Sequence, residues 1–157
     1  MVKSGPSLLV SNHLQLINMI LISHSAEETF LIGQKIGESC SGGEVFLLSG
    51  DLGAGKTCLT QGLASGLGIK RRVNSPTFNI MKIYNIKNKD IKMLCHIDAY
   101  RLKSGFDLTN IGFDDYLHKD VVIVIEWAEL VKDIWPKERI RIEIKNIKEG
   151  RQIKISR

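Results

Sequence analysis

The residues most able to do chemistry in this chain form the run Gly50-Asp51-Leu52-Gly53-Ala54-Gly55-Lys56-Thr57. Its spacing, G-x-x-x-x-G-K-T, is that of the phosphate-binding P-loop. Glycines let the backbone wrap around a phosphate chain, and the amide N–H groups at a helix N-terminus attract its negative charge. In such a loop Lys56 reaches the β- and γ-phosphates, and the hydroxyl of Thr57 binds Mg²⁺. The run therefore predicts a Mg²⁺–nucleotide site.

Two carboxylates are placed to complete that site. Mg²⁺ prefers oxygen ligands in near-octahedral geometry, and in P-loop folds a carboxylate comes from the C-terminal end of a neighbouring parallel strand. Glu126 follows the apolar run 121–125, and Asp98 ends the segment that begins at residue 91. Both carboxylates are therefore candidates for the metal site.

One loop has the position of a switch segment. Thr77 follows the expected P-loop helix in a stretch that Pro76 stiffens. Loops at this place become ordered when the γ-phosphate and Mg²⁺ are present, and they relax after hydrolysis. Thr77 is accordingly a candidate for sensing the γ-phosphate.

Lys56 is expected to face solvent when no nucleotide is bound.

A second polar cluster surrounds Asp98. His96, Asp98 and Tyr100 alternate along the chain, so they would share one face if the strand continues. We interpret His96 as a hydrogen-bonded histidine at a sheet edge, in preference to a proton carrier. Trp127 is interpreted as packing beside a core strand, in preference to a partner contact.

The elements that must position these residues alternate between strands and helices. The apolar run 45–48 predicts a buried strand before the P-loop, and leucines at helical spacing predict a helix after it. Upstream, residues 19–22 form a plausible strand, and Ser25 with Glu28 resembles a capping box that opens a helix to about Glu38. Downstream, the pattern predicts a hairpin through residues 78–97, a short helix with loops over 104–118, a central parallel strand at 121–125 and a closing hairpin over 140–155.

Composition bounds the class of protein. The chain has 157 residues, of which 43% are hydrophobic and 25% charged, as expected for one globular domain. No apolar run approaches the roughly 20 residues of a membrane span. The three cysteines have no metal-ligand spacing and are interpreted as reduced thiols in a cytosolic protein. The net charge of +5 is compatible with a nucleic-acid or acidic partner but does not decide the matter.

The first residues match nothing downstream. Residues 1–18 are expected to be an N-terminal extension. Either this extension is disordered, or the start codon has been assigned too far upstream and Met19 is the natural start of the chain. Residues 19–157 are expected to form a single P-loop ATPase domain.

Beyond the P-loop, three motifs resemble the TsaE family (formerly YjeE), the small ATPases of bacterial tRNA threonylcarbamoyladenosine (t6A) synthesis. They are Ser75-Pro76-Thr77-Phe78, His96-Ile97-Asp98-Ala99-Tyr100-Arg101-Leu102 and Ile125-Glu126-Trp127. The stretch 107–117 is also similar to the family, and the likeness covers about residues 19–157. The chain departs from the family in the segment before Met19 and at Cys58, where the family usually has a second threonine.

The resemblance implies a fold and a role. The fold is a P-loop NTPase α/β domain with a mostly parallel central sheet flanked by helices. The activity is weak, partner-stimulated ATP hydrolysis in the cytoplasm, with ATP and Mg²⁺ as cofactors. The partners are TsaD, which transfers the threonylcarbamoyl group to the adenosine beside the anticodon, and its companion TsaB; tRNA is reached indirectly through that complex.

The resemblance also implies residue roles. Catalysis would involve Lys56, Asp98, Glu126 and Thr77, and the metal would be held by Thr57, Glu126 and Asp98. The nucleotide would contact the P-loop run and Ala26, Cys58 and Arg151.

Two other functions are open at this point. One is a small-metabolite kinase, which would need phosphate-clamping arginines in a lid, yet residues 104–118 contain no arginine. The other is a switch that binds ATP without hydrolysing it, because hydrolysis in P-loop proteins often requires a partner to complete the site.

Overall fold

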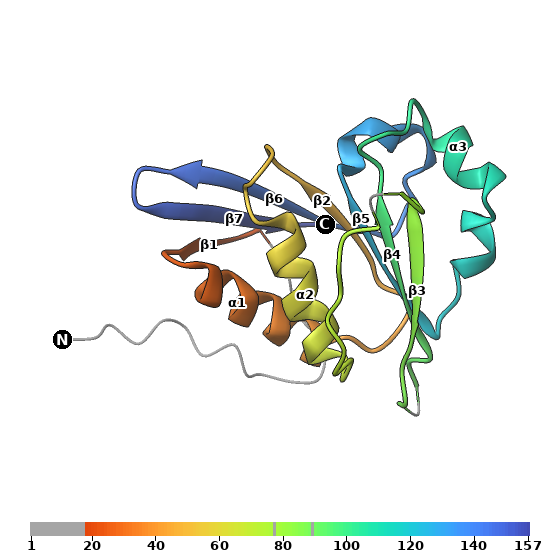
Figure 1. Cartoon of the computed structure of the whole chain (residues 1–157), viewed down its shortest axis with the longest axis horizontal. Helices are drawn as coiled ribbons and strands as arrows, with labels where there is room; N and C mark the ends of the chain where they lie inside the picture. The colour runs from red at the N-terminus through yellow and green to blue at the C-terminus, as the bar shows by residue number, and fades with distance from the viewer. Residues whose placement is uncertain (1–17, 77, 89) are drawn as a thin grey trace.

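The computed structural model describes residues 18–76, 78–88 and 90–157, which form a seven-stranded sheet with helices on both faces (Figure 1). The strand order across the sheet is β1-β7-β6-β2-β5-β4-β3. The strands are β1 (Met19–Ser23), β2 (Val45–Ser49), β3 (Met81–Asn85), β4 (Met93–Asp98), β5 (Val121–Glu126), β6 (Ile140–Ile147) and β7 (Gly150–Ser156). The helices are α1 (Ala26–Glu38), α2 (Lys56–Gly66) and α3 (Gly105–Asn110), with 3-10 helices η1 (Phe113–Tyr116) and η2 (Ala128–Ile134).

The centre of the sheet is parallel. Strands β6, β2, β5 and β4 run in one direction, whereas β1 and β7 at one end and β3 at the other pair antiparallel. This confirms the predicted α/β fold with a mostly parallel central sheet and antiparallel hairpins. Residues 1–17, for which an extension was expected, lie outside the described part of the chain.

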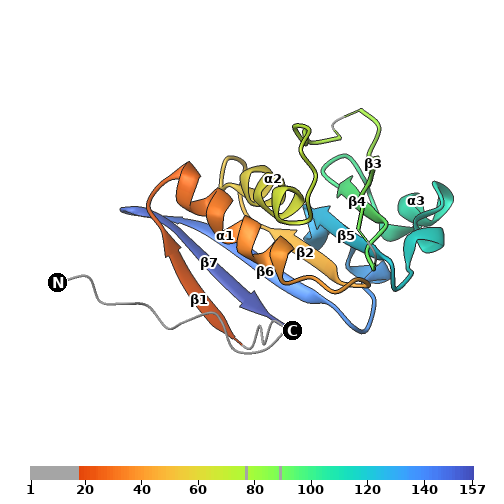
Figure 2. The ribbon, with the colours of Figure 1, turned by 90° about the horizontal axis from the view of Figure 1, so that it is seen from below.

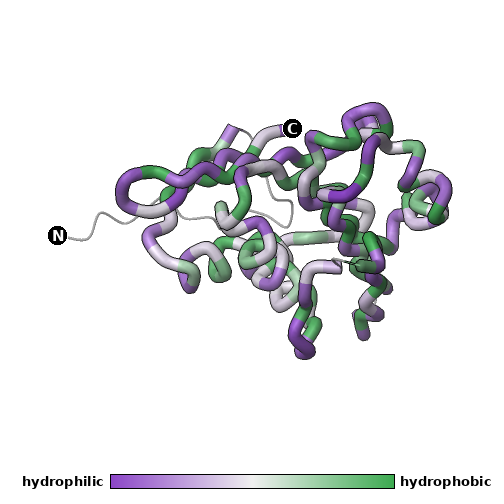
Figure 3. Tube along the Cα trace, turned by 45° about the horizontal axis from the view of Figure 1, so that its top comes forward, coloured by the Kyte–Doolittle hydropathy of each residue, from purple (hydrophilic) through white to green (hydrophobic). Residues whose placement is uncertain are grey.

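The β6–β7 hairpin shows why alternation predicts its strands. Ile140, Ile142 and Ile144 of β6 are buried together with Ile153 and Ile155 of β7, while their neighbours face outward. Hydrophobic and hydrophilic residues alternate along this hairpin in Figure 3. One face therefore packs on the core and the other is exposed, as predicted.

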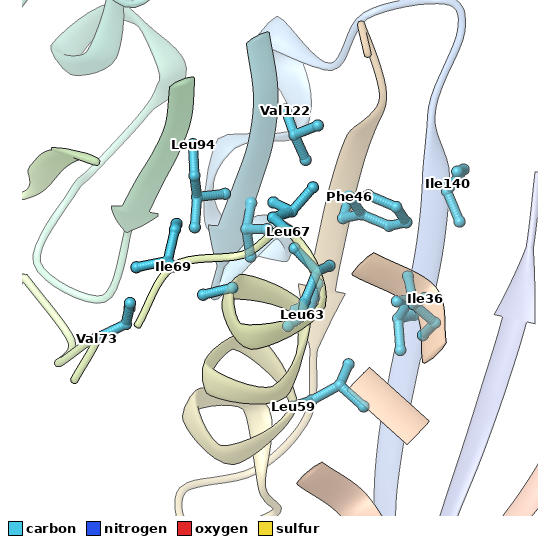
Figure 4. Close-up of a cluster of buried hydrophobic side chains, with 14 of the residues drawn as sticks. Ile36, Phe46, Leu59, Leu63, Leu67, Ile69, Val73, Leu94, Val122 and Ile140 are labelled. Atoms are coloured by element: carbon cyan, nitrogen blue, oxygen red, sulfur yellow. The ribbon is translucent and has the colours of Figure 1, made fainter. Parts of the chain in front are cut away.

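Each face of the sheet has its own hydrophobic cluster. Helices α1 and α2 cover one face, where Ile36 and Leu63 pack above Phe46 and Val122 (Figure 4). On the other face, α3, η1 and η2 cover a cluster that includes Phe113 and Ile125. Strand β5 is buried along its whole length because it contributes to both clusters. Burial on both faces explains why residues 121–125 of this strand are all apolar.

Helices α1 and α2 lie side by side on one face of the sheet, and glycines let them approach closely (Figure 2). A Cβ atom on Gly33 would lie 2.2 Å from the carbonyl oxygen of Leu59, and one on Gly62 would lie 2.0 Å from that of Phe30. Any larger residue at these positions would force the helices apart. The close packing brings the start of α1 beside the start of α2, where the P-loop ends.

The carboxyl ends of three parallel strands meet at one edge of the sheet. Leu48 and Asp98 are each the register partner of Glu126, so β2, β5 and β4 end at the same level. The P-loop follows β2 directly. The topology therefore places the two candidate carboxylates beside the phosphate loop.

Candidate nucleotide site

The P-loop joins β2 to α2 through a backbone that only glycine tolerates well at several points. Gly50, Gly53 and Gly55 have φ angles of 149°, 75° and 110°, values that side chains rarely adopt. Gly50 also lies against β6, because a Cβ atom there would be 2.3 Å from the carbonyl oxygen of Ile144. Between them, Asp51 and Leu52 are exposed and Ala54 is buried. The loop thus curves out from the sheet and returns at the N-terminus of α2.

Lys56 is buried, so the expectation that it faces solvent is wrong. Its side chain is 5% exposed, and its ammonium donates hydrogen bonds to the carbonyl oxygens of Gly50 (2.5 Å) and Asp51 (2.9 Å). The ring of Trp127 lies 3.9 Å from Nζ. Burial lowers the pKa of Lys56, and the nearby charge of Glu126 opposes this shift. An ammonium has three N–H donors, so one remains for a phosphate oxygen.

Glu126 connects the end of β5 to the P-loop helix. The hydroxyl of Thr57 donates a hydrogen bond of 2.9 Å to Glu126 Oε2, and Nε2 of His96 lies 2.8 Å from the other carboxylate oxygen. Glu126 is 2% exposed and His96 is fully buried. Because β4 lies between β3 and β5, His96 is inside the sheet, and its predicted place at a sheet edge is wrong.

Asp98 on β4 lies beside Glu126 on β5 in the strand register but makes different contacts. Its Oδ2 accepts a hydrogen bond of 2.6 Å from the hydroxyl of Ser75, and its Oδ1 accepts one of 3.0 Å from the backbone N–H of Tyr100. Strand β4 ends at Asp98, so Tyr100 does not continue the alternation of His96 and Asp98. Instead, Tyr100 packs against Trp127, with ring centroids 4.9 Å apart.

The donor set fits a magnesium ion held together with a nucleotide. Thr57 and Glu126 offer a hydroxyl and a carboxylate already in contact, and Asp98 lies next to them in the register. Within residues 18–76, 78–88 and 90–157, no cluster of three or more His, Cys, Asp or Glu side chains could hold a metal alone. Mg²⁺ commonly binds through one or two carboxylates plus phosphates and water, so the two facts agree.

The other predicted nucleotide contacts form a second group beside the P-loop. Arg151 Nη1 donates a hydrogen bond of 3.0 Å to Thr29, and the Arg151 side chain lies 3.3 Å from where a Cβ atom on Gly55 would be. Cys58 donates a hydrogen bond of 3.1 Å to the carbonyl oxygen of Ala26. Burial raises the pKa of the Cys58 thiol, and Arg151 opposes this. The structure thus brings Ala26, Cys58 and Arg151 to the P-loop.

Two contacts in the site were missed by sequence reasoning. Trp127 was interpreted as packing, yet its ring covers the ammonium of Lys56, and its φ of 57° is unusual for a bulky residue. The contact of His96 with Glu126 was also missed, although the alternation of His96 with Asp98 was a signal that both side chains point to one face. Thr77 lies outside the described residues, so its predicted role is neither supported nor opposed by the structure.

Comparisons with known proteins agree on one family. The family model described as "Threonylcarbamoyl adenosine biosynthesis protein TsaE" matches residues 23–153. A Bacillus subtilis protein named tRNA threonylcarbamoyladenosine biosynthesis protein TsaE is 44% identical over 76% of this chain and 72% of its own length. A Treponema pallidum protein of the same name is 37% identical over 84% of this chain and 95% of its own length.

Solved structures give a matching fold. A crystal structure of Bacillus subtilis YdiB superposes with a TM-score of 0.72, with 37% sequence identity, over 88% of this chain and 84% of that one. The two chains therefore share their fold over most of their lengths.

Proposed function

This chain belongs to the TsaE family, and we propose on that basis that it is a P-loop ATPase that supports t6A modification of tRNA. The fold and the P-loop point to nucleotide binding, and the family name gives the process. The proposed cofactors are ATP and Mg²⁺, the proposed reaction is slow hydrolysis of ATP to ADP and phosphate, and the proposed compartment is the cytoplasm. In the described part of the chain, no helix is long and apolar enough to span a membrane.

The observation that carries the proposal is the contact between Thr57 and Glu126. It joins the first turn of α2 to the end of β5 beside the ammonium of Lys56. Lys56 would bind the β- and γ-phosphates with its free N–H, while Thr57 and Glu126 would hold Mg²⁺. Such an ion, when bound, neutralises charge that develops on the phosphates.

The remaining residues receive supporting roles. Asp98, with its oxygens held by Ser75 and Tyr100, is proposed to order water near the γ-phosphate. Arg151 lies against Gly55 and is proposed to contact the phosphates or ribose, and Ala26 and Cys58 are proposed to border the nucleotide. Thr77 is proposed as the residue that senses the γ-phosphate, on the strength of the family resemblance.

We infer that the partners are TsaD, which carries out the transfer, and TsaB, so that tRNA is reached indirectly. Support for a docking face comes from apolar side chains exposed around the site. Leu52 in the P-loop is 81% exposed, Phe78 is 84% exposed and Tyr100 is 58% exposed. Exposed apolar side chains that form a contiguous patch mark protein interaction sites, and we propose that these three belong to the docking face.

Binding to the TsaD–TsaB pair is expected to depend on the nucleotide. A nucleotide state can change the affinity for a partner only if the protein makes different contacts with the partner in that state. Leu52 could provide such a difference, because it lies in the loop proposed to wrap the phosphates. We expect the ATP-analogue state to bind about 5- to 150-fold more tightly than the ADP or nucleotide-free state. Isothermal titration calorimetry with each state measures this.

Thr77→Ala provides the matched variant for that experiment. We expect it to bind nucleotide but to lose the difference in partner affinity between the ATP-analogue and ADP states. Equal partner affinity in all nucleotide states of the unsubstituted protein would contradict the switch, even with nucleotide binding intact.

A further inference from the structure

We propose that His96 is a positioning residue, which holds the Glu126 carboxylate so that its other oxygen faces Thr57. The inference rests on the proposed function, because Glu126 matters only if it serves Mg²⁺–nucleotide binding. His96 is buried in the site, and none of the roles proposed for the P-loop, the carboxylates and Arg151 involves it.

The geometry fixes Glu126 from two sides. His96 Nε2 lies 2.8 Å from Oε1, and the Thr57 hydroxyl lies 2.9 Å from Oε2. Each oxygen therefore has its own partner, one from β4 and one from α2. A carboxylate held at both oxygens cannot rotate freely about its terminal bond, so the pair of contacts sets the plane in which Glu126 presents its oxygens.

The hydrogen-bond inventory gives the direction of the bond to His96. An ionised carboxylate has only acceptors, so Nε2 of His96 must carry the proton. The other ring nitrogen, Nδ1, is buried and has no partner among the described residues. Leaving a buried polar atom unpaired lowers the stability of a folded protein. The ring is thus oriented so that Nε2 bonds to Glu126, while Nδ1 stays without a partner among the described residues.

The position of Lys56 explains what this orientation achieves. Glu126 is close enough to influence the pKa of Lys56, yet among the described side chains no ion pair joins the two. A carboxylate free to turn toward the ammonium would compete with phosphate for it. The bond from His96 keeps one oxygen of Glu126 on the β4 side, so that the ammonium remains available to a nucleotide.

Three substitutions separate this role from simple packing. In His96→Gln, the amide nitrogen occupies the place of Nε2, because the same number of bonds leads to it, so the donor to Glu126 is kept. In His96→Asn the amide nitrogen occupies the place of Nδ1 and does not reach Glu126. His96→Phe keeps the outline of the ring without any donor. The exposed His118, changed to Asn, is the matched control.

The first measurement is the Mg²⁺ dependence of binding to a fluorescent ATP analogue. We expect His96→Asn and His96→Phe to raise the half-saturating Mg²⁺ concentration by roughly 10- to 100-fold, the usual effect of removing a group that orients a metal ligand. Binding without Mg²⁺, measured in EDTA, is expected to stay unchanged. His96→Gln and His118→Asn are expected to behave like the unsubstituted protein.

The second measurement needs neither nucleotide nor metal. Long-range proton–nitrogen NMR of the unsubstituted protein is expected to place the His96 ring proton on Nε2, and a proton found on Nδ1 alone would overturn the proposal. Unchanged Mg²⁺ dependence in folded His96→Asn and His96→Phe would overturn it as well. If the unsubstituted protein did not bind nucleotide, or bound it equally well without Mg²⁺, the proposed function would be contradicted instead. Failure of the His96 proposal and failure of the proposed function therefore give different results.

Discussion

Lys56→Ala is expected to lower ATP turnover by on the order of 10³-fold, the scale of losing one preorganised charge from a phosphoryl-transfer site. The structure supplies the reason. Two of the three ammonium N–H groups are bonded to the loop carbonyl oxygens of Gly50 and Asp51, which leaves the third for the proposed contact with the phosphates. The lysine is therefore held in place before nucleotide arrives, and alanine removes the charge along with this preorganisation.

The fold is expected to survive that substitution. Burial lowers the pKa of Lys56, which means that the folded protein holds this charge at a cost in solvation. Removing the charge removes that cost, so the melting temperature of Lys56→Ala should not fall sharply below that of the unsubstituted protein. Lys132→Ala is the matched control, because its ammonium also lies near a tryptophan ring, 6.0 Å from the centroid of Trp135. Turnover that is unchanged in folded Lys56→Ala would refute the assignment of the site.

The second large effect is expected at Glu126. Glu126→Gln should raise the Mg²⁺ concentration needed for nucleotide binding by at least about 10-fold, and more than Asp98→Asn does. The reason is the identity of the partner: Glu126 accepts a hydrogen bond from Thr57, the other proposed metal ligand, whereas Asp98 accepts its hydrogen bonds from Ser75 and the backbone of Tyr100. Titration of Mg²⁺ against a fluorescent ATP analogue compares the two variants.

Glu129→Gln controls for the loss of charge in that comparison. Glu129 also acts on the pKa of Lys56 but makes no bond to Thr57 among the described contacts. We expect it to bind Mg²⁺–nucleotide as the unsubstituted protein does. If Asp98→Asn has the larger effect, the roles of the two carboxylates are reversed, and equal losses would contradict the distinction drawn from their hydrogen bonds.

The parts of the site that lie close together in sequence could be predicted from it. The P-loop, its strand and its helix follow one another, so their local spacing was enough. The positions of Glu126 and Asp98 beside the P-loop could be predicted because each ends a strand, and parallel strands end at a common edge. The alternating isoleucines of β6 and β7 likewise predicted a hairpin with one exposed face.

The contacts across strands could not be predicted in the same way. The bond of His96 to Glu126 depends on the register of β4 with β5, which no local pattern specifies. The burial of Lys56 depends on Trp127, whose ring turns over the loop from a residue with an unusual φ of 57°. Both features belong to tertiary packing, and both change how the site is expected to work.

Phosphate release from ATP, measured with and without TsaD and TsaB, tests the central claim most directly. We expect slow, Mg²⁺-dependent release by the chain alone, faster release when both partners are present, and none above background for Lys56→Ala under either condition. Nucleotide binding without any phosphate release, even with TsaD and TsaB present, would contradict the claim that this protein is an ATPase.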